Sequence, residues 1–145
     1  MKFSTKTLYG LKAVLVLAAR EGQGSLSVSQ IARRQMISIA YLEQILNRLK
    51  RKGLVKSVRG PQGGYVLAKK PSEITLESLL YAFEEHAFSF EDGGADETAL
   101  ANAIFWKKFK NALTDGLSKI SLKNLMDEAH RQKKSKSATN YTFHI

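Results

Sequence analysis

The sequence contains no cysteine. Without a thiol the chain can form no disulfide bond and no thiolate metal site, and cysteine nucleophiles are excluded. It also has no apolar run near the ~18 residues that a membrane-spanning helix needs, and no basic start followed by the apolar core of a signal peptide. We therefore expect a cytoplasmic protein with no disulfide, no metal and no membrane contact.

Acidic residues are scarce in the first half of the chain. Residues 1–70 hold 14 Lys and Arg against 2 acidic residues, a net charge of +12. Residues 71–100 have 8 acidic residues and no Lys or Arg, and residues 101–145 have a net charge of +6. A basic block suits a protein that binds phosphates, although basic charge alone is also typical of a solvated surface. Because the basic block coincides with a helix–turn–helix pattern at residues 27–51, phosphate binding is favoured.

Residues 27–51 have the pattern of a helix–turn–helix. Ser27 and Gln30 form a capping box at the start of the first helix, and Ser38 is placed to cap the second. One face of the second helix is apolar: Leu42, Ile45, Leu46 and Leu49. The opposite side carries small, amide and charged side chains: Ala40, Glu43, Gln44, Asn47, Arg48 and Arg51. Such groups can contact base edges or phosphates, and their position in the second helix of the motif favours DNA binding over an ordinary solvated face.

A glycine-rich hairpin follows directly. Residues 54–58 and 65–68 are predicted to form two short strands, joined by the loop RGPQGG at 59–64. This loop is not a phosphate-binding P-loop, because no Gly-Lys-Ser/Thr follows and no helix begins after the glycines. Arg59 at the base of the loop is well placed to enter a narrow minor groove. A plain hairpin turn is the alternative.

Flanking segments complete a small domain. A first helix is expected to begin at Ser4, and its core stripe is formed by Leu8, Leu11, Leu15 and Ala18. A short helix capped by Thr75 follows the hairpin. We therefore expect a winged helix–turn–helix domain over residues 1–85, followed by an acidic, aperiodic connecting loop over 86–98.

The next helix has the strongest pattern of the chain, over residues 98–120. Its apolar stripe includes Phe105, Trp106, Phe109, Leu113, Leu117 and Ile120. A domain of about 85 residues already has its own core, so this stripe needs another partner. We expect that partner to be the same helix of a second subunit, giving a homodimer; folding back onto its own domain is the alternative.

The remaining residues divide into two parts. Residues 99–130 are expected to form the dimerisation helices, and residues 131–145 a flexible basic tail that ends in the apolar segment Tyr141–Ile145. The predicted fold class is mainly α with a small β-hairpin wing (α+β): a winged helix–turn–helix domain plus a long C-terminal dimerisation helix.

Four motifs resemble the Rrf-type family of bacterial winged-helix regulators: MKFSTKTLYGLKA, ISIAYLEQIL, KGLVKSVRGPQGGYVLAKKP and ITLESLLYAFE. The match is close over about residues 1–85 and looser over the Trp106 helix. The resemblance implies that Ser38, Tyr41, Glu43 and Gln44 are contacts of the recognition helix, and that residues 59–65 form the wing. The full set expected to bind DNA is Lys2, Ser4, Thr5, Ser38, Tyr41, Glu43, Gln44, Arg48, Arg51, Arg59, Gly60, Gln62, Gly63, Gly64 and Tyr65.

The chain departs from the family pattern at two places. Met36 stands where a glycine is often found in the helix–turn–helix turn. Iron–sulphur members of the family carry three cysteines in the segment that corresponds to residues 86–105, and this chain has none. Its three histidines, His86, His130 and His144, are too few and too scattered to replace them. No cofactor is therefore expected, and the resemblance narrows to a cluster-free branch typified by a cysteine-metabolism repressor, whose tail the ending NYTFHI resembles.

These observations predict a sequence-specific, homodimeric transcriptional regulator, a repressor that binds a palindromic double-stranded DNA operator in the bacterial nucleoid. The alternative is a signalling interaction protein, whose DNA binding is controlled by docking of a metabolic enzyme onto the tail or the acidic loop. The resemblance to the cluster-free branch implies cysteine synthase as that enzyme. An enzyme is not supported, since no nucleophile–base pair, metal-ligand spacing or phosphate loop is visible.

Overall fold

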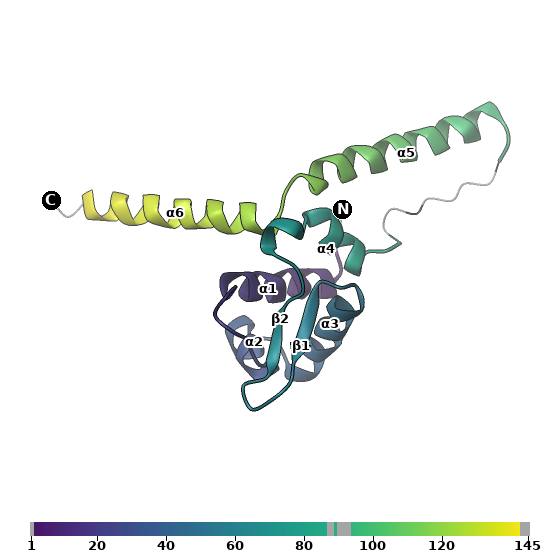
Figure 1. Cartoon of the computed structure of the whole chain (residues 1–145). Helices are drawn as coiled ribbons and strands as arrows, with labels where there is room; N and C mark the ends of the chain where they lie inside the picture. The colour runs from purple at the N-terminus through teal and green to yellow at the C-terminus, as the bar shows by residue number, and fades with distance from the viewer. Residues whose placement is uncertain (1, 87–88, 90–93, 143–145) are drawn as a thin grey trace.

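The computed structural model describes residues 2–86, 89 and 94–142, with side chains up to residue 138 (Figure 1). The elements occur in the order α1 (Thr5–Ala19), α2 (Val28–Gln35), α3 (Ile39–Arg51), β1 (Val55–Val58), β2 (Gly64–Leu67), η1 (Pro71–Glu73), α4 (Leu76–Phe83), α5 (Glu97–Ser118) and α6 (Leu122–Thr142). This order is the predicted winged helix–turn–helix followed by long helices, so the predicted α+β fold class is confirmed. Within the described residues, no helix is long and apolar enough to cross a membrane.

The four predicted helix caps are all present. Backbone N–H groups donate to the side-chain oxygens of Ser4, Ser27, Ser38 and Thr75 at the starts of α1, α2, α3 and α4. In the capping box of α2, the Ser27 N–H also donates to Gln30 Oε1 at 2.9 Å. Each cap satisfies an N–H that the first turn of a helix leaves without a partner, which explains why the boundaries fall where the sequence places them.

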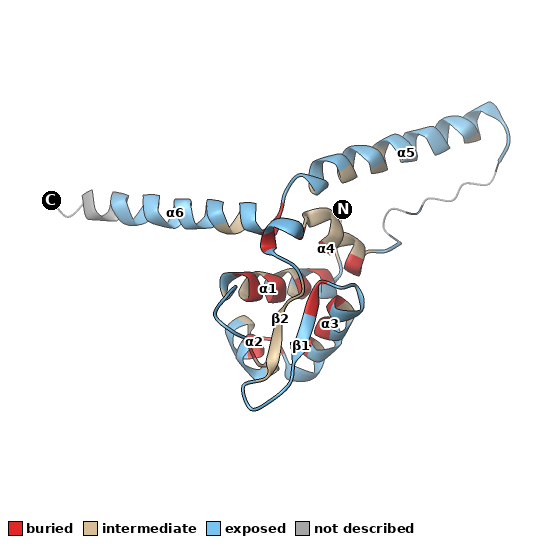
Figure 2. Ribbon diagram, in the orientation of Figure 1, coloured by how far each residue is buried: buried red, intermediate tan, exposed pale blue. Residues whose placement is uncertain are grey.

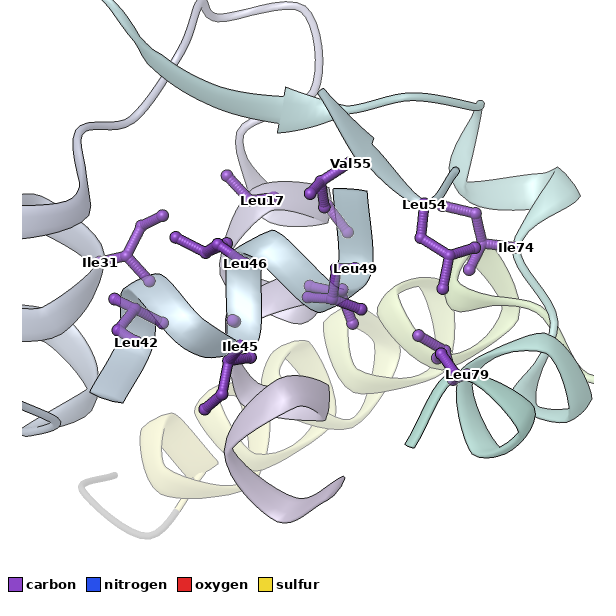
Figure 3. Packing of buried hydrophobic residues seen from close by; sticks show 14 of the residues in the cluster. Leu17, Ile31, Leu42, Ile45, Leu46, Leu49, Leu54, Val55, Ile74 and Leu79 are labelled. Carbon is purple, nitrogen blue, oxygen red and sulfur yellow. The ribbon is translucent and has the colours of Figure 1, made fainter. Parts of the chain in front are cut away.

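The core lies between α1, α3 and the β-hairpin (Figure 3). Leu42, Ile45, Leu46 and Leu49 are at most 1% exposed, which confirms the predicted inner face of α3. The two strands are antiparallel, with Val55 opposite Leu67 and Val58 opposite Gly64. Burial of this cluster fixes the rotation of α3 about its axis, and therefore fixes which side chains it turns toward solvent.

The buried face of α1 differs from the expected stripe. Leu8 is 53% exposed, and Leu11 and Leu15 are only half-buried. Ala18 is buried as predicted, and the other buried residues of α1 are Thr7, Gly10, Ala13, Val14 and Leu17. Because α1 is apolar on most sides, its periodicity is compatible with more than one inner face. Packing decides between them: a Cβ at Gly10 would lie 2.1 Å from Cζ of Phe83, so α4 packs against the bare backbone of α1 at that point.

The long helices α5 and α6 project away from the domain (Figure 2). None of the described residues of α5 is buried. After α5 the chain returns to the segment before α4, where Leu76 N donates to Ile120 O and Leu122 N donates to Ile74 O, both at 2.9 Å. Leu122 is fully buried, so the start of α6 is fixed to the domain while the rest extends outward.

Residues 131–142 form the second half of α6, where the sequence predicts a flexible tail. The segment has no proline or glycine, and its Lys, Arg, Gln and Ala residues are good helix formers. Helix nucleation is costly, but here it occurs upstream at the anchored Leu122, and the helix then continues. The i,i+4 ion pair of Lys123 with Asp127, at 2.6 Å, supports it. The composition alone indicated disorder because it does not show that the helix begins at an anchored residue. Of the predicted apolar segment at 141–145, residues 143–145 lie outside the described residues.

A carboxylate ties the end of α4 to the start of α1. Oε1 of Glu84 accepts hydrogen bonds from Ser4 N at 2.8 Å and from Thr7 Oγ1 at 2.5 Å. These bonds, that of Thr7 first, lower the pKa of Glu84 below its ordinary value of 4.5. They favour the charged form, which is the form that accepts both bonds.

We therefore expect acid to weaken the fold at this contact. A group whose pKa is lower in the folded state stabilises the protein at pH values above its pKa in the unfolded state. This stabilisation is lost as the pH falls through the pKa of the folded state. In urea titrations at fixed protein concentration, the wild type should lose more stability below pH 4.5 than Glu84→Gln does. Equal losses for the two proteins would contradict the assignment. Glu97→Gln, at an exposed residue, is the matched control and should follow the wild type.

Candidate DNA-binding surface

The surface of α3 that faces solvent carries the predicted contact groups. Ser38, Glu43, Gln44 and Arg51 are exposed, as the sequence predicts for the face opposite the core. Ser38 Oγ accepts from Tyr41 N at 3.3 Å, so this hydroxyl also serves as the cap. The helix therefore presents an amide, a carboxylate and a guanidinium on one rigid exposed face.

The turn before α3 contains Met36, one of the two positions where the chain departs from the family pattern. Met36 has a left-handed backbone, with φ of 54°, and its side chain is 93% exposed. A residue other than glycine in this conformation costs about 1 kcal/mol. The turn nevertheless closes, because Ile37 N donates to Ala32 O at 3.1 Å and Ile37 is buried below it.

Two predicted contacts have packing roles in the structure. Arg48 is half-buried, and its guanidinium donates to Ala82 O at 2.5 Å and to Phe83 O at 3.4 Å. These are carbonyls of the last turn of α4, which a helix leaves without partners. Arg48 therefore joins α3 to α4, and the structure does not present it as a free cation. Tyr41 is also half-buried, with its ring 5.8 Å from that of Tyr9 on α1.

The wing is anchored to the rest of the domain at its tip and along its edge. Ser25 Oγ donates to Gln62 O at 2.6 Å. Tyr65 pairs with Leu26 through two backbone hydrogen bonds of 2.7 and 3.0 Å, which form an isolated antiparallel bridge beside the hairpin. Arg59, Gly60 and Gln62 are exposed, whereas Gly63, Gly64 and Tyr65 are half-buried. Of the predicted wing residues, the first three are thus open to a ligand, and the last three shape the loop.

Gly64 is required by a close backbone approach. A Cβ at this position would lie 2.2 Å from the carbonyl oxygen of Leu26 and 2.7 Å from Ser27 N. Gly60 has a φ of 116°, a conformation that L side chains rarely adopt. The glycines of the loop therefore serve its conformation, and Arg59 is the predicted wing residue with a charged side chain.

The start of α1 lies on the same side as part of α3. Lys2, Ser4 and Thr5 are exposed, as predicted for contacts to DNA, although Ser4 also caps α1 and donates to Glu84. A groove of about 770 Å³ separates this end of α1 from α3, and its lining residues are Lys6, Gln44, Ile45, Asn47, Arg48, Lys50, Arg51 and Phe83. Lys6, Asn47 and Lys50 were not among the predicted contacts. The helical register indicated Asn47, but only the packing of α1 on α3 brings Lys6 to this groove.

The positive charge at the end of α3 is partly offset. Lys52 Nζ lies 3.2 Å from Glu85 Oε1 in an exposed ion pair. The hydrogen bond and charge of Lys52 lower the pKa of Glu85. The cations that remain on the groove are Lys6, Lys50 and Arg51, with the Lys50 ammonium 3.0 Å from Ser57 Oγ of β1. The charge available to phosphates therefore lies along the middle of α3 and the start of α1.

Among the described residues, the predicted dimerisation stripe is only partly covered. Phe105, Trp106 and Phe109 form one aromatic cluster, with ring centroids 5.0 to 6.4 Å apart. Phe105 is 57% exposed and Ile120 is 37% exposed, while Trp106, Phe109, Leu113 and Leu117 are half-buried. Leu100 and Ile104, which are 57% and 54% exposed, lie outside the predicted stripe.

Metal-ligating side chains do not gather anywhere in the described part of the chain, where no group of three His, Asp or Glu could hold an ion. His86 and His130 are both exposed and belong to separate segments. His144 lies outside the described residues.

Comparison with known proteins gives the family. The profile of the Rrf2 family, described as an iron-dependent transcriptional regulator, matches residues 3–128. The transcriptional regulator IscR of Photorhabdus laumondii is 36% identical over 132 residues, which cover 88% of this chain and 80% of that protein. The structure of CymR, the global cysteine regulator of B. subtilis, is similar with a TM-score of 0.75 at 34% identity, covering 88% of this chain and 98% of CymR. IscR of T. potens has a TM-score of 0.72 at 36% identity, with coverages of 89% and 88%. The chain therefore belongs to the Rrf2 family of DNA-binding winged-helix transcriptional regulators, in the group of IscR and CymR.

Proposed function

We propose that the protein is a homodimeric repressor that acts in the bacterial nucleoid on a palindromic double-stranded DNA operator. The exposed face of α3 would enter the major groove, and Arg59 on the wing would reach the adjacent minor groove. The observation that carries this proposal is that an exposed row of Gln44, Asn47 and Arg51 adjoins a groove with further cations. A twofold dimer explains why the operator would be palindromic.

The proposal excludes an iron–sulphur cluster. Such clusters are held by cysteine thiolates, with histidine replacing some of them in one class. This sequence has no cysteine and three histidines, so the donor set does not fit. DNA binding by this protein should therefore not depend on a cluster, whatever signal controls it. We likewise propose that it is not an enzyme, since the exposed groove at α3 contains amide and cationic groups without a nucleophile–base pair.

The helix and the wing make separable contributions, which gives the first test. Arg59→Ala should weaken operator binding by about 1–3 kcal/mol if Arg59 makes a specific base-edge contact. Gln44→Ala should instead relax base preference at one position in each half-site. Titrations at several salt concentrations measure both effects, and log affinity should fall with log salt by about 0.9 for each phosphate neutralised. Unchanged affinity and preference in both variants would contradict the helix-plus-wing assignment. Lys134→Ala, on the exposed outer part of α6, is the matched control for loss of a positive charge.

We expect Glu43 to make the protein discriminate between bases in the operator. It is one of only two acidic residues in the first 70, and its charge repels phosphates. A carboxylate can accept from the N4 amino group of cytosine and disfavours other bases, by about 1–3 kcal/mol for a good contact. Pairing with Lys50 or with Asn47 on the helix surface is the alternative; of these two, Lys50 contacts Ser57 of β1. Glu43→Ala should tighten binding to degenerate sites in a panel of duplexes. An unchanged ranking of the panel would refute this role.

A second candidate function is control by a docked enzyme. It is favoured by the similarity to CymR, a global cysteine regulator, which makes cysteine synthase the partner to test. The predicted docking segment Tyr141–Ile145 has no described side chains. Operator titrations with and without cysteine synthase, for the full chain and for a deletion of Tyr141–Ile145, separate the two functions. An effect of the enzyme that the deletion abolishes supports docking, and no effect on the full chain excludes it.

A further inference from the structure

The first turn of α3 presents a large apolar side chain to solvent. Ile39, the first residue of α3, is 49% exposed. Among the described residues, it belongs neither to the buried core nor to the partly buried side chains packed against that core. Ala40 beside it is also exposed. Packing within the chain therefore does not account for an isoleucine at this position.

The place of Ile39 in the motif suggests a ligand. In a helix–turn–helix, the N-terminal residues of the second helix contact base edges in the major groove. Residues four positions apart are neighbours on a helix surface, so Ile39 adjoins Glu43 and Ala40 adjoins Gln44. Glu43 and Gln44 are both exposed. The end of α3 that would lie deepest in the groove thus combines an apolar patch with two hydrogen-bonding groups.

Thymine is the base with an apolar group in the major groove, its C5-methyl, and apolar side chains contact that group. We infer that Ile39, with Ala40 beside it, contacts a thymine methyl group in each half-site and is a specificity-determining residue. The inference rests on the proposed function, because it requires α3 to occupy the major groove. This contact requires a thymine in the operator close to the base pair that Glu43 and Gln44 read, whereas contacts by Glu43 and Gln44 alone would not require one.

Uracil tests this contact directly, because it pairs like thymine but lacks the methyl group. The probe is the duplex that the wild type selects from a randomised pool, with each thymine replaced by deoxyuridine at one position at a time. At the contacted position, wild-type affinity should fall about fourfold per half-site, the loss expected for one buried methyl-sized group. Ile39→Ala should bind the thymine and uracil duplexes equally, and Ile39→Val should retain part of the difference.

Leu8→Ala is the matched control, because Leu8 is a similarly exposed apolar residue (53%) on α1, and it should show the wild-type penalty in full. Ile39→Ala alters an exposed side chain, and circular dichroism will verify its folding. A wild type that is indifferent to uracil at every position would overturn the inference, as would an Ile39→Ala variant that keeps the whole penalty. Selection of no preferred duplex would instead contradict the proposed function, and the inference with it.

Discussion

Leu113→Asp in α5 should convert the protein into monomers and lower its affinity for a two-half-site duplex by about 10²- to 10⁴-fold. Leu113 lies in the middle of the apolar stripe that ends at Ile120, next to the aromatic cluster of Phe105, Trp106 and Phe109. Burying an unpaired carboxylate in such an interface is strongly unfavourable. A monomer binds each half-site independently and loses the gain in effective concentration that two linked binding domains provide.

Light scattering at micromolar concentration measures the first effect, and titration of a palindromic duplex measures the second. Asn111→Asp is the matched control, because it adds the same charge to an exposed position of α5 outside the stripe. It should stay dimeric. A wild type that is monomeric at this concentration would end the proposal, and so would a Leu113→Asp variant that remains dimeric.

Gly64→Ala should destabilise the domain by about 1–3 kcal/mol, the range for forcing extra atoms into a packed site. The added methyl would lie 2.2 Å from the carbonyl oxygen of Leu26, and backbone cannot move aside as a flexible side chain can. Relief of the clash would break the two hydrogen bonds between Leu26 and Tyr65. The wing would lose its bridge to Leu26, and Arg59 would no longer be held in position, so operator affinity should fall as well.

Urea unfolding at fixed protein concentration measures the loss of stability. Gly22→Ala is the control: Gly22 has a positive φ of 75°, but a Cβ there would meet no atom within 4 Å. Its cost should be limited to backbone strain of about 1 kcal/mol. If Gly64→Ala is no less stable than Gly22→Ala, the close approach to Leu26 has no energetic consequence and the explanation of this glycine is wrong.

The structure departs from the sequence-based expectations where more than one arrangement satisfies the local pattern. The helix α1 is apolar on most sides, so Leu8 and Val14 were both acceptable as core residues, and contact between Gly10 and Phe83 selected Val14. Arg48 has the side chain of a phosphate contact, yet α4 places two free carbonyls within its reach. Residues 131–142 have a polar composition typical of a flexible tail, but a buried Leu122 nucleates a helix that continues through them.

The sequence by itself determined the features that depend on neighbouring residues. The helix caps act within three positions of the chain, at Ser4, Ser27, Ser38 and Thr75. The 3.6-residue period alone placed Leu42 and Leu49 on the buried face of α3. Only the tertiary structure decided the features that depend on distant segments: Lys6 beside α3, Arg48 on α4, and the anchoring of the wing to Leu26. The hydrophobic effect is non-directional, so it favours packing of α1, α4 and the hairpin on α3 without choosing which residues meet. Shape and hydrogen bonding at each contact determine which residues meet, and these are known only from the tertiary structure.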